Sequence, residues 1–354
     1  MLNRRLVGTA ALTLCSATAL IAGPASAATK TVYAGPNAKL PDEALTVNDF
    51  FRKSITIRQG DRVRWQMRGF HNVILPARGD KPPAFFAPDP VAKVTGVADA
   101  AGTPFWFNGQ PRVQIDPRSA FPTGGRTYDG TTLTGSGLSQ TDGPPPPYTL
   151  KFTKTGKFAF YCTIHEGMKG TVKVVAKGKK VPTAAQDRKA ATAQLAKLTK
   201  QAAKLDDVKP PAATVLGGSD KAPVAWLKFF PKRQTVKVGQ PLTFSVTGSQ
   251  EPHTLTFGPE AYLKQVLEGQ ITPVPNPQGP PSLVFDPRVL LPSDPPPQLP
   301  PYTGANHGNG FFSTGVIGKG TPGGTKTTIT FAKAGSYKYI CLIHPEMNGT
   351  VDVK

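Results

Sequence analysis

Two short stretches of the sequence carry sulfur and nitrogen side chains at matching positions. They are Cys162, His165 and Met168 in the first stretch and Cys341, His344 and Met347 in the second. Each residue of the second stretch follows its counterpart by 179 positions. A thiolate, an imidazole and a thioether in such close succession are ligands of a soft transition metal, above all copper. The sequence therefore predicts two metal-binding loops of the same design.

A further histidine lies far upstream of each loop. His71 precedes Cys162 by 91 residues, and His253 precedes Cys341 by 88 residues. Copper that alternates between Cu(I) and Cu(II) is well accommodated by two imidazoles and a thiolate with a distant thioether. We therefore predict two copper ions, one for each complete ligand set. The sets are His71, Cys162, His165 and Met168, and His253, Cys341, His344 and Met347.

Strand patterns surround the predicted ligands. Residues 157–162 alternate in polarity, so the Cys162 thiol points to the same inner face as Phe158 and Phe160. Residues 63–67 and 242–246 alternate in the same way shortly before the two upstream histidines. Met67 lies on the apolar face of its strand, so we interpret it as a core residue and not as a ligand.

Composition and repetition divide the chain into parts. The chain has 36 Gly and 38 Pro, and 18% of its residues are charged, which favours short strands and turns over long helices. We expect a first domain at 28–176, a basic linker at 177–222 and a second domain at 223–354. Each domain contains a Pro- and Gly-rich insertion, at 76–147 and 258–324. We expect these insertions to be ordered but to hold little regular structure.

The linker contains a helical pattern at about residues 183–205. Leu195, Leu198, Ala202 and Leu205 fall on one stripe of this helix. The apolar stripe is narrow and rich in alanine, so we expect the helix to dock on one domain and not on a membrane.

The first 27 residues have the pattern of a secretory signal peptide. Arg4 and Arg5 precede an apolar run at 6–22, and a small-residue cleavage site ends at Ala27. Cys15 lies in the apolar run and would be removed with it. No later stretch reaches the ~18 apolar residues that a membrane helix needs. We therefore expect an exported protein, secreted or held in the cell envelope.

The chain is strongly basic. Its formal charge is +20, and loss of Arg4 and Arg5 lowers the charge to +18. Such a surface attracts anionic cell-wall polymers, anionic membrane surfaces or an acidic redox protein, although a basic surface also serves solubility alone. Nucleic acid is not an expected partner, because an exported chain without a nucleic-acid-binding motif has no reason to meet it.

The ligand pattern resembles that of the cupredoxins, the group of plastocyanin, azurin and amicyanin. The short loop from Cys162 to Met168 is most similar to amicyanin, and the run from His71 to Val73 resembles plastocyanin. The resemblance covers about 48–76 and 148–175, and again 229–257 and 326–353. It implies an all-β chain with two Greek-key β-sandwiches, type 1 blue copper and one-electron transfer. It also implies that electrons pass through the loop histidines, His165 and His344.

Other functions stay open on the sequence alone. Copper storage, buffering or delivery without redox turnover uses similar ligands. Catalysis is disfavoured, because copper oxidases and nitrite reductases need further histidines and the chain spares only His307, which we interpret as an exposed loop residue. A disulfide between Cys162 and Cys341 is the purely structural alternative. The two sites have different neighbours, Asn72 in the first and Thr254 in the second, so we expect unequal reduction potentials.

Overall fold

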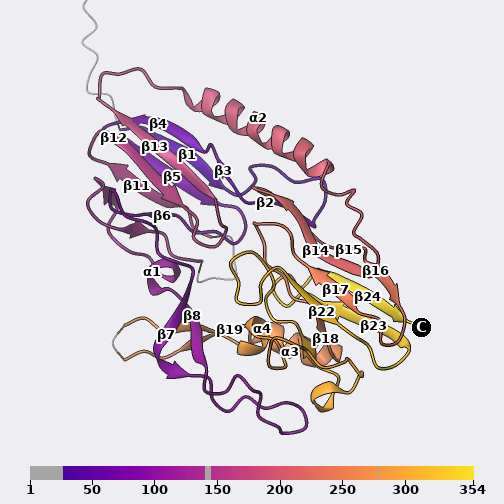
Figure 1. Ribbon diagram of the computed structural model, residues 1–354. Coiled ribbons are helices and arrows are strands. Elements are labelled where there is room, and N and C mark those ends of the chain that lie inside the picture. The colour runs from indigo at the N-terminus through magenta and orange to yellow at the C-terminus, as the bar shows by residue number, and fades with distance from the viewer. Residues whose placement is uncertain (1–26, 140–144, 278) are drawn as a thin grey trace, which may run out of the picture.

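The computed structural model describes residues 27–139, 145–277 and 279–354 of the chain. The predicted signal peptide lies almost entirely outside the described residues. Strands dominate the described residues, and helices are few, which confirms the predicted all-β class. The strands form two β-sandwiches and a further sheet built from the insertions (Figure 1).

The first sandwich consists of two five-stranded sheets. Its strands are β1 (Thr29–Ala34), β3 (Phe50–Phe51), β4 (Ser54–Arg58), β5 (Arg62–Met67), β6 (Ile74–Leu75), β9 (Thr127–Tyr128), β10 (Thr134–Gly135), β11 (Tyr148–Phe152), β12 (Gly156–Tyr161) and β13 (Lys169–Val175). The strand orders are β3-β1-β5-β11-β9 and β10-β6-β12-β13-β4. Trp65, Phe152 and Phe160 fill the space between the sheets, and Met67 is buried with them, as predicted.

The second sandwich repeats this arrangement. Its strands are β2 (Leu45–Val47), β14 (Thr214–Lys221), β15 (Val224–Phe230), β16 (Arg233–Val236), β17 (Leu242–Ser245), β18 (Thr256–Phe257), β21 (Phe312–Ser313), β22 (Lys326–Ile329), β23 (Gly335–Ile340) and β24 (Asn348–Val353). The strand orders are β2-β15-β14-β17-β22 and β16-β24-β23-β18-β21. The parallel pairs β1–β5 and β14–β17 occupy equivalent places, as do the antiparallel pairs β12–β13 and β23–β24.

Two strands of the second sandwich come from segments that the sequence assigned elsewhere. β2 precedes most of the first sandwich in the chain, yet it pairs with β15 through Leu45–Val47. β14 lies within 177–222, so that range holds a central strand as well as a connection. A three-residue edge strand and a strand interrupted by Gly217 and Gly218 have too little alternation for sequence patterns to detect them.

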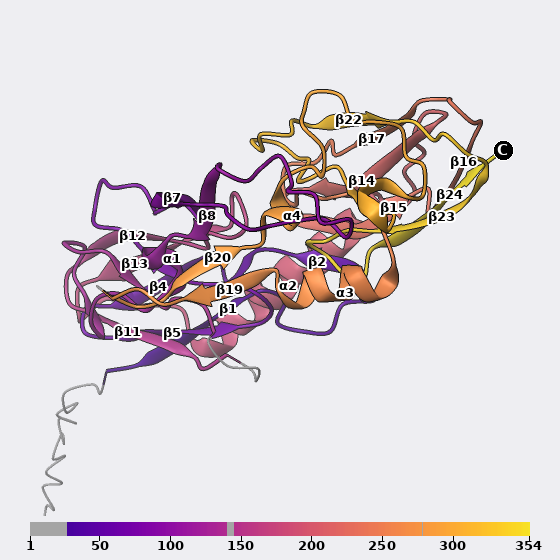
Figure 2. The same cartoon turned by 90° about the horizontal axis from the view of Figure 1, so that it is seen from below.

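The insertions contain regular structure, so the expectation of little regular structure there is wrong. They hold β7 (Phe86–Lys93), β8 (Pro111–Ile115), β19 (Ile271–Val274), β20 (Ser282–Phe285), α1 (Pro117–Ala120), α3 (Glu260–Glu268), α4 (Pro287–Leu290) and η1 (Asn306–Gly308). The sheet order is β19-β20-β8-β7, and Val284 pairs with Gln114 across the two insertions. In Figure 2, which looks from below, β7, β8, β19 and β20 lie close together and overlap the first sandwich in projection.

Each insertion packs against the other half of the molecule. Phe105 and Phe107 of the first insertion share a buried cluster with Leu342, which follows Cys341. In a second cluster, Phe285 of the second insertion and Ile164 of the first ligand loop pack against the same buried residues of the first insertion, among them Phe85. Both insertions therefore contribute side chains to the covering of both ligand loops.

The predicted linker helix is present as α2 (Ala184–Ala203). Thr183 caps its N-terminus, accepting a hydrogen bond from the backbone N–H of Gln186, whose side chain accepts in turn from the Thr183 N–H. The stripe expected from the sequence is buried, but it docks across both sandwiches. It packs against Phe51 of the first and Trp226 of the second. Figure 1 shows α2 reaching from the first sandwich towards β2 and β14.

His307 links the insertions and is not an exposed loop residue, contrary to the expectation. Its Nδ1 lies 3.3 Å from a carboxylate oxygen of Asp99, and its Nε2 lies 3.2 Å from one of Asp294. Only 16% of its side chain is exposed. The hydrogen bond to Asp294 raises the pKa of His307, and Asp99 adds to this effect against the opposing influence of burial.

Replacement of His307 by Gln should therefore cost stability in a pH-dependent way. A raised pKa in the folded state means that the imidazolium stabilises the fold below the unfolded pKa of about 6.5. This contribution disappears as the pH rises through the folded pKa. We expect a loss of about 1 kcal/mol near pH 5.5 and a smaller loss near pH 9, measured by urea unfolding. Glu268→Gln, in an exposed ion pair with Lys264, is the control. Equal losses at both pH values would contradict the assignment.

Candidate metal centres

The first predicted ligand set converges at one end of the first sandwich. His71 lies in the loop between β5 and β6, and Cys162 directly follows β12. The Cys162 Sγ lies 3.8 Å from His71 Nδ1 and 3.6 Å from His165 Nδ1. The two Nδ1 atoms are 3.1 Å apart. Three donor atoms from segments 91 residues apart thus face one point.

The second set has nearly the same geometry. The Cys341 Sγ lies 3.8 Å from the Nδ1 atoms of both His253 and His344. Those two nitrogens are 3.1 Å apart. His253 is held in place by two backbone hydrogen bonds with Ile317, which pin the end of its loop to the insertion. The repeated spacing in the sequence therefore corresponds to a repeated arrangement in space.

The methionines close both loops through their backbone. The Cys162 N–H donates to the Met168 carbonyl, and the Met168 N–H donates to the His165 carbonyl. Cys341, His344 and Met347 repeat both bonds. The Met168 and Met347 side chains are each 1% exposed and belong to the same core clusters as their cysteines.

The donor set fits a soft cation. Burial lowers the pKa of His71 to about 3, so its imidazole is neutral and offers a lone pair. The Nδ1 atoms of His71 and His165 lie 3.1 Å apart and can hold only one proton between them, so at least one of these two nitrogens is unprotonated and carries a lone pair. Both cysteines are free and buried, so the disulfide alternative is wrong. Copper is the metal that this combination of thiolate, imidazole and thioether suits best.

The cysteine environments differ in the metal-free protein. Burial raises the pKa of the Cys162 thiol. At Cys341 burial acts in the same direction, but hydrogen bonds from His253 and His344 outweigh it and hold the pKa of this thiol well below its ordinary value. The Cys341 sulfur also accepts a hydrogen bond of 3.4 Å from the Thr254 N–H.

The residue after each upstream histidine forms a hydrogen bond with the residue after the cysteine of the same site. The Asn72 amide oxygen accepts from the Thr163 N–H at 2.9 Å, and its Nδ2 donates to the Ser119 carbonyl at 3.0 Å. In the second site the Thr254 hydroxyl accepts from the Leu342 N–H at 2.8 Å. Each side chain thus fixes the residue that follows the cysteine.

Sequence patterns did not identify the glycines that make room for the upstream histidines. A Cβ on Gly35 would lie 2.0 Å from the Arg68 carbonyl oxygen and 3.0 Å from His71 Nε2, and a Cβ on Gly218 would lie 2.6 Å from His253 Nε2. Both glycines have positive φ, 92° and 76°. Gly35 directly follows β1, and Gly218 lies in β14 just beyond the residues that pair with β17. Because β1 and β14 occupy equivalent places in the two sandwiches, the recurrence of glycine there was the signal in the sequence that could have identified both residues.

Glu251 is the other residue that sequence patterns missed. Its carboxylate oxygens lie 3.6 Å from His165 Nε2 and 3.6 Å from His344 Nε2. Burial opposes the charge on Glu251, but a hydrogen bond from His344 and the nearby imidazoles hold the pKa of this carboxyl below its ordinary value. The carboxylate is therefore ionised at neutral pH. The only signal was a Glu two residues before His253.

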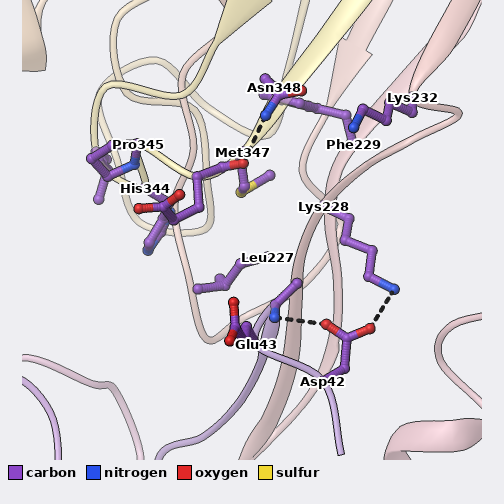
Figure 3. Close-up of a pocket in the computed structure, with 13 residues that line it drawn as sticks. Asp42, Glu43, Leu227, Lys228, Phe229, Lys232, His344, Pro345, Met347 and Asn348 are labelled. Carbon is purple, nitrogen blue, oxygen red and sulfur yellow. Dashed lines mark hydrogen bonds and ion pairs between the residues drawn. The ribbon is translucent and has the colours of Figure 1, made fainter. Parts of the chain in front are cut away.

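A hollow borders each ligand loop. The one beside the second loop has a volume of about 720 Å³ and is lined by residues of both halves. Figure 3 shows His344 and Met347 on one side of it and Asp42, Glu43 and Lys228 on the other. Phe85 and Phe86 line the hollow beside the first loop.

The chain is similar to solved plastocyanin and amicyanin structures. A mutant fern plastocyanin is 17% identical and matches 40% of this chain and 99% of its own, with a TM-score of 0.21. The oxidised plastocyanin of Dryopteris crassirhizoma is 19% identical over 41% and 99%, with a TM-score of 0.22. Amicyanin from Paracoccus versutus is 20% identical over 42% and 88%, with a TM-score of 0.21.

No family model and no curated protein matches the chain. At identities of at most 20% and TM-scores near 0.2, these likenesses carry no weight for function. Any function assigned to the chain therefore rests on the residues that converge within it.

Loss of the hydrogen bond between the Thr163 N–H and the Asn72 side chain should destabilise the first half of the molecule. Asn72→Ala leaves the Thr163 N–H without its acceptor, and we expect a loss of about 1–2 kcal/mol in urea unfolding. Thr254→Val should act similarly by removing the acceptor of the Leu342 N–H. Ser336→Ala, which removes an exposed hydrogen bond to Asp352, is the control and should change stability by less than about 0.5 kcal/mol. A loss at Asn72 no larger than at Ser336 would contradict this role.

Proposed function

We propose that the chain is an exported cupredoxin-type protein that binds two copper ions and carries single electrons. The convergence of two equivalent His–Cys–His groups, each with a methionine in the same loop, is the observation that carries the proposal. Bound copper supplies a one-electron couple between Cu(I) and Cu(II).

The chain's residues have distinct roles in this proposal. Cys162 and Cys341 bind as thiolates, because a bound metal ion deprotonates them. The four histidines supply the remaining strong bonds through Nδ1. Met168 and Met347 would each offer a weakly binding thioether that adjusts the reduction potential of the copper. The ligand loops are short and closed by backbone hydrogen bonds, so their geometry resists change when the oxidation state changes.

Burial of the ligands favours electron transfer over metal storage or delivery. The second site's Cys341 is completely buried and its Met347 is 1% exposed, so metal exchange requires the loop to open. Delivery proteins instead need ligands that a recipient can reach. Within the described ranges, two groups of His and Cys converge, and the spare histidine, His307, is engaged by two carboxylates. A further catalytic copper site therefore has no support among these residues.

The proposal also includes export of the protein and an acidic or anionic partner. The signal pattern at 1–27 supports a secreted or cell-envelope location, and none of the helices in the described part of the chain has the length and hydropathy to cross a membrane. A formal charge of +18 after cleavage supports an acidic redox partner or an anionic surface. The different ties at Asn72 and Thr254 support unequal potentials.

Copper loading tests the function directly. The mature protein should bind about two copper ions per chain and show an intense thiolate-to-copper band in the visible spectrum. Cys162→Ser and Cys341→Ser should each retain one copper ion and lose about half of the band, because each removes one thiolate. In an electron carrier, the colour should disappear when one electron per copper is added and return when the protein is reoxidised. This reversible change distinguishes an electron carrier from a storage protein.

His307→Gln is the matched control for this experiment, since it removes the one histidine outside both sets. It should leave the copper content and the visible band unchanged. A wild-type protein that takes up no copper, or that takes it up without a thiolate band, contradicts the proposal.

A further inference from the structure

A single carboxylate stands between the two candidate copper sites. The Glu251 Oε1 lies 3.6 Å from Nε2 of His165, and its Oε2 lies 3.6 Å from Nε2 of His344. In both histidines Nδ1 faces the cysteine sulfur, so Nε2 is the atom that points away from the site. A route from one loop imidazole to the other through Glu251 therefore crosses two gaps of 3.6 Å.

Glu251 is buried and firmly held. It is 9% exposed, and the Asn48 Nδ2 donates to its Oε1. The preceding Gln250 donates from its side chain to the Glu166 carbonyl at 2.8 Å, which attaches this segment to the first ligand loop. The Gln250 N–H donates to Asp220 at 2.9 Å, which attaches the same segment to β14. The carboxylate is thus anchored from both halves of the molecule.

The position of Glu251 does not follow from the repetition of the two halves of the chain. Glu251 precedes His253 by two residues, and the equivalent residue of the first half is Gly69, which precedes His71 by two. Gly69 has φ of 102° and offers no side chain. One carboxylate therefore contacts a loop imidazole of both candidate sites, and the first half has no counterpart of it.

Each loop histidine exposes only a small part of its side chain, although a hollow borders each loop. The side chain of His165 is 11% exposed and that of His344 is 16% exposed. The outer edge of each imidazole faces Glu251. This orientation suits transfer between the sites better than independent exchange of each site with an external protein.

We propose that Glu251, with the imidazoles of His165 and His344, forms a bridge through which the two copper sites exchange an electron within one molecule. The inference rests on the proposed function. One electron leaves the reduced site and enters the oxidised site, so the first is oxidised and the second reduced by one electron. No bond forms or breaks, no proton moves, and the total charge is conserved. A one-electron donor outside the molecule supplies the first electron.

The bridge also predicts a shared electrostatic effect. A negative charge beside both ligand imidazoles stabilises the oxidised state of both sites. Removal of this one charge should therefore shift two reduction potentials in the same direction, upwards. A residue with a merely structural role in one half has no reason to do so.

Two substitutions at Glu251 separate charge from connectivity. Glu251→Gln keeps the shape of the side chain and removes its charge, whereas Glu251→Ala opens the gap between the imidazoles. Copper content and the visible band are measured first on the full-length mature protein. Spectroelectrochemical titration then gives both potentials. We expect Glu251→Gln to raise both of them.

Flash reduction measures the exchange itself. A photoexcited ruthenium complex injects less than one electron per molecule into the oxidised protein, and the visible bands are followed in time. Wild type should show a relaxation phase whose rate is independent of protein concentration. Cys341→Ser, which has a single site, should lack this phase. Glu251→Ala should lose it while both copper ions and both thiolate bands remain.

Glu166→Gln and Glu346→Gln are matched controls, because each removes an exposed carboxylate from one ligand loop. Each should shift at most the potential of its own site and retain the relaxation phase. Persistence of the phase in Glu251→Ala, its absence from copper-loaded wild type, or a shift of only one potential in Glu251→Gln overturns the bridge while leaving the copper function intact. Failure of the wild type to bind copper overturns both.

Discussion

The pairing of β2 with β15 is the interaction on which the relation between the two sandwiches depends. Leu45–Val47 leaves the first half of the chain and completes a sheet of the second half. Tandem domains joined only by a linker generally move relative to one another. Here a shared edge strand removes that freedom, and Asn48, directly after β2, is positioned to reach Glu251.

Helix α2 and the insertions reinforce the same constraint. α2 buries its apolar stripe against both sandwiches, and its Asp187 forms a buried ion pair with Lys30 at 2.9 Å. On the other side, β8 and β20 continue one sheet across the two insertions. An ion pair with one partner removed would leave an uncompensated buried charge, so Lys30 and Asp187 favour a single docked position for the helix.

A fixed relation between the halves gives the ligand loops a common environment. Apolar side chains of both insertions cover the loops, with Phe105 and Phe107 in one cluster with Leu342, and Phe85 and Phe285 in another with Ile164. Exclusion of water from a metal site lowers the local dielectric and strengthens every charge near it. Glu251 therefore lies 3.6 Å from a histidine of each ligand set only because the two halves are held together.

The sequence by itself determined those features of the fold and the sites that depend on residues close together in the chain. Alternating polarity identified the strands around Cys162 and Cys341, and helical periodicity identified the helix that begins after Thr183. The all-β class was what the resemblance of the ligand pattern to the cupredoxins implied. Equal spacing in the two halves was enough to anticipate two equal constellations. These features follow from local periodicity, which the chain carries in any context.

Only the tertiary structure decided how the halves meet. The exchange of β2, the sheet shared by the insertions, the engagement of His307 and the position of Glu251 all join residues far apart in the chain. Glu251 lies 86 positions after His165, and no periodicity relates the two. Such contacts depend on the relative placement of whole sheets, which short patterns do not encode. The two ligand sets are therefore predictable from sequence, and the position of Glu251 between them is not.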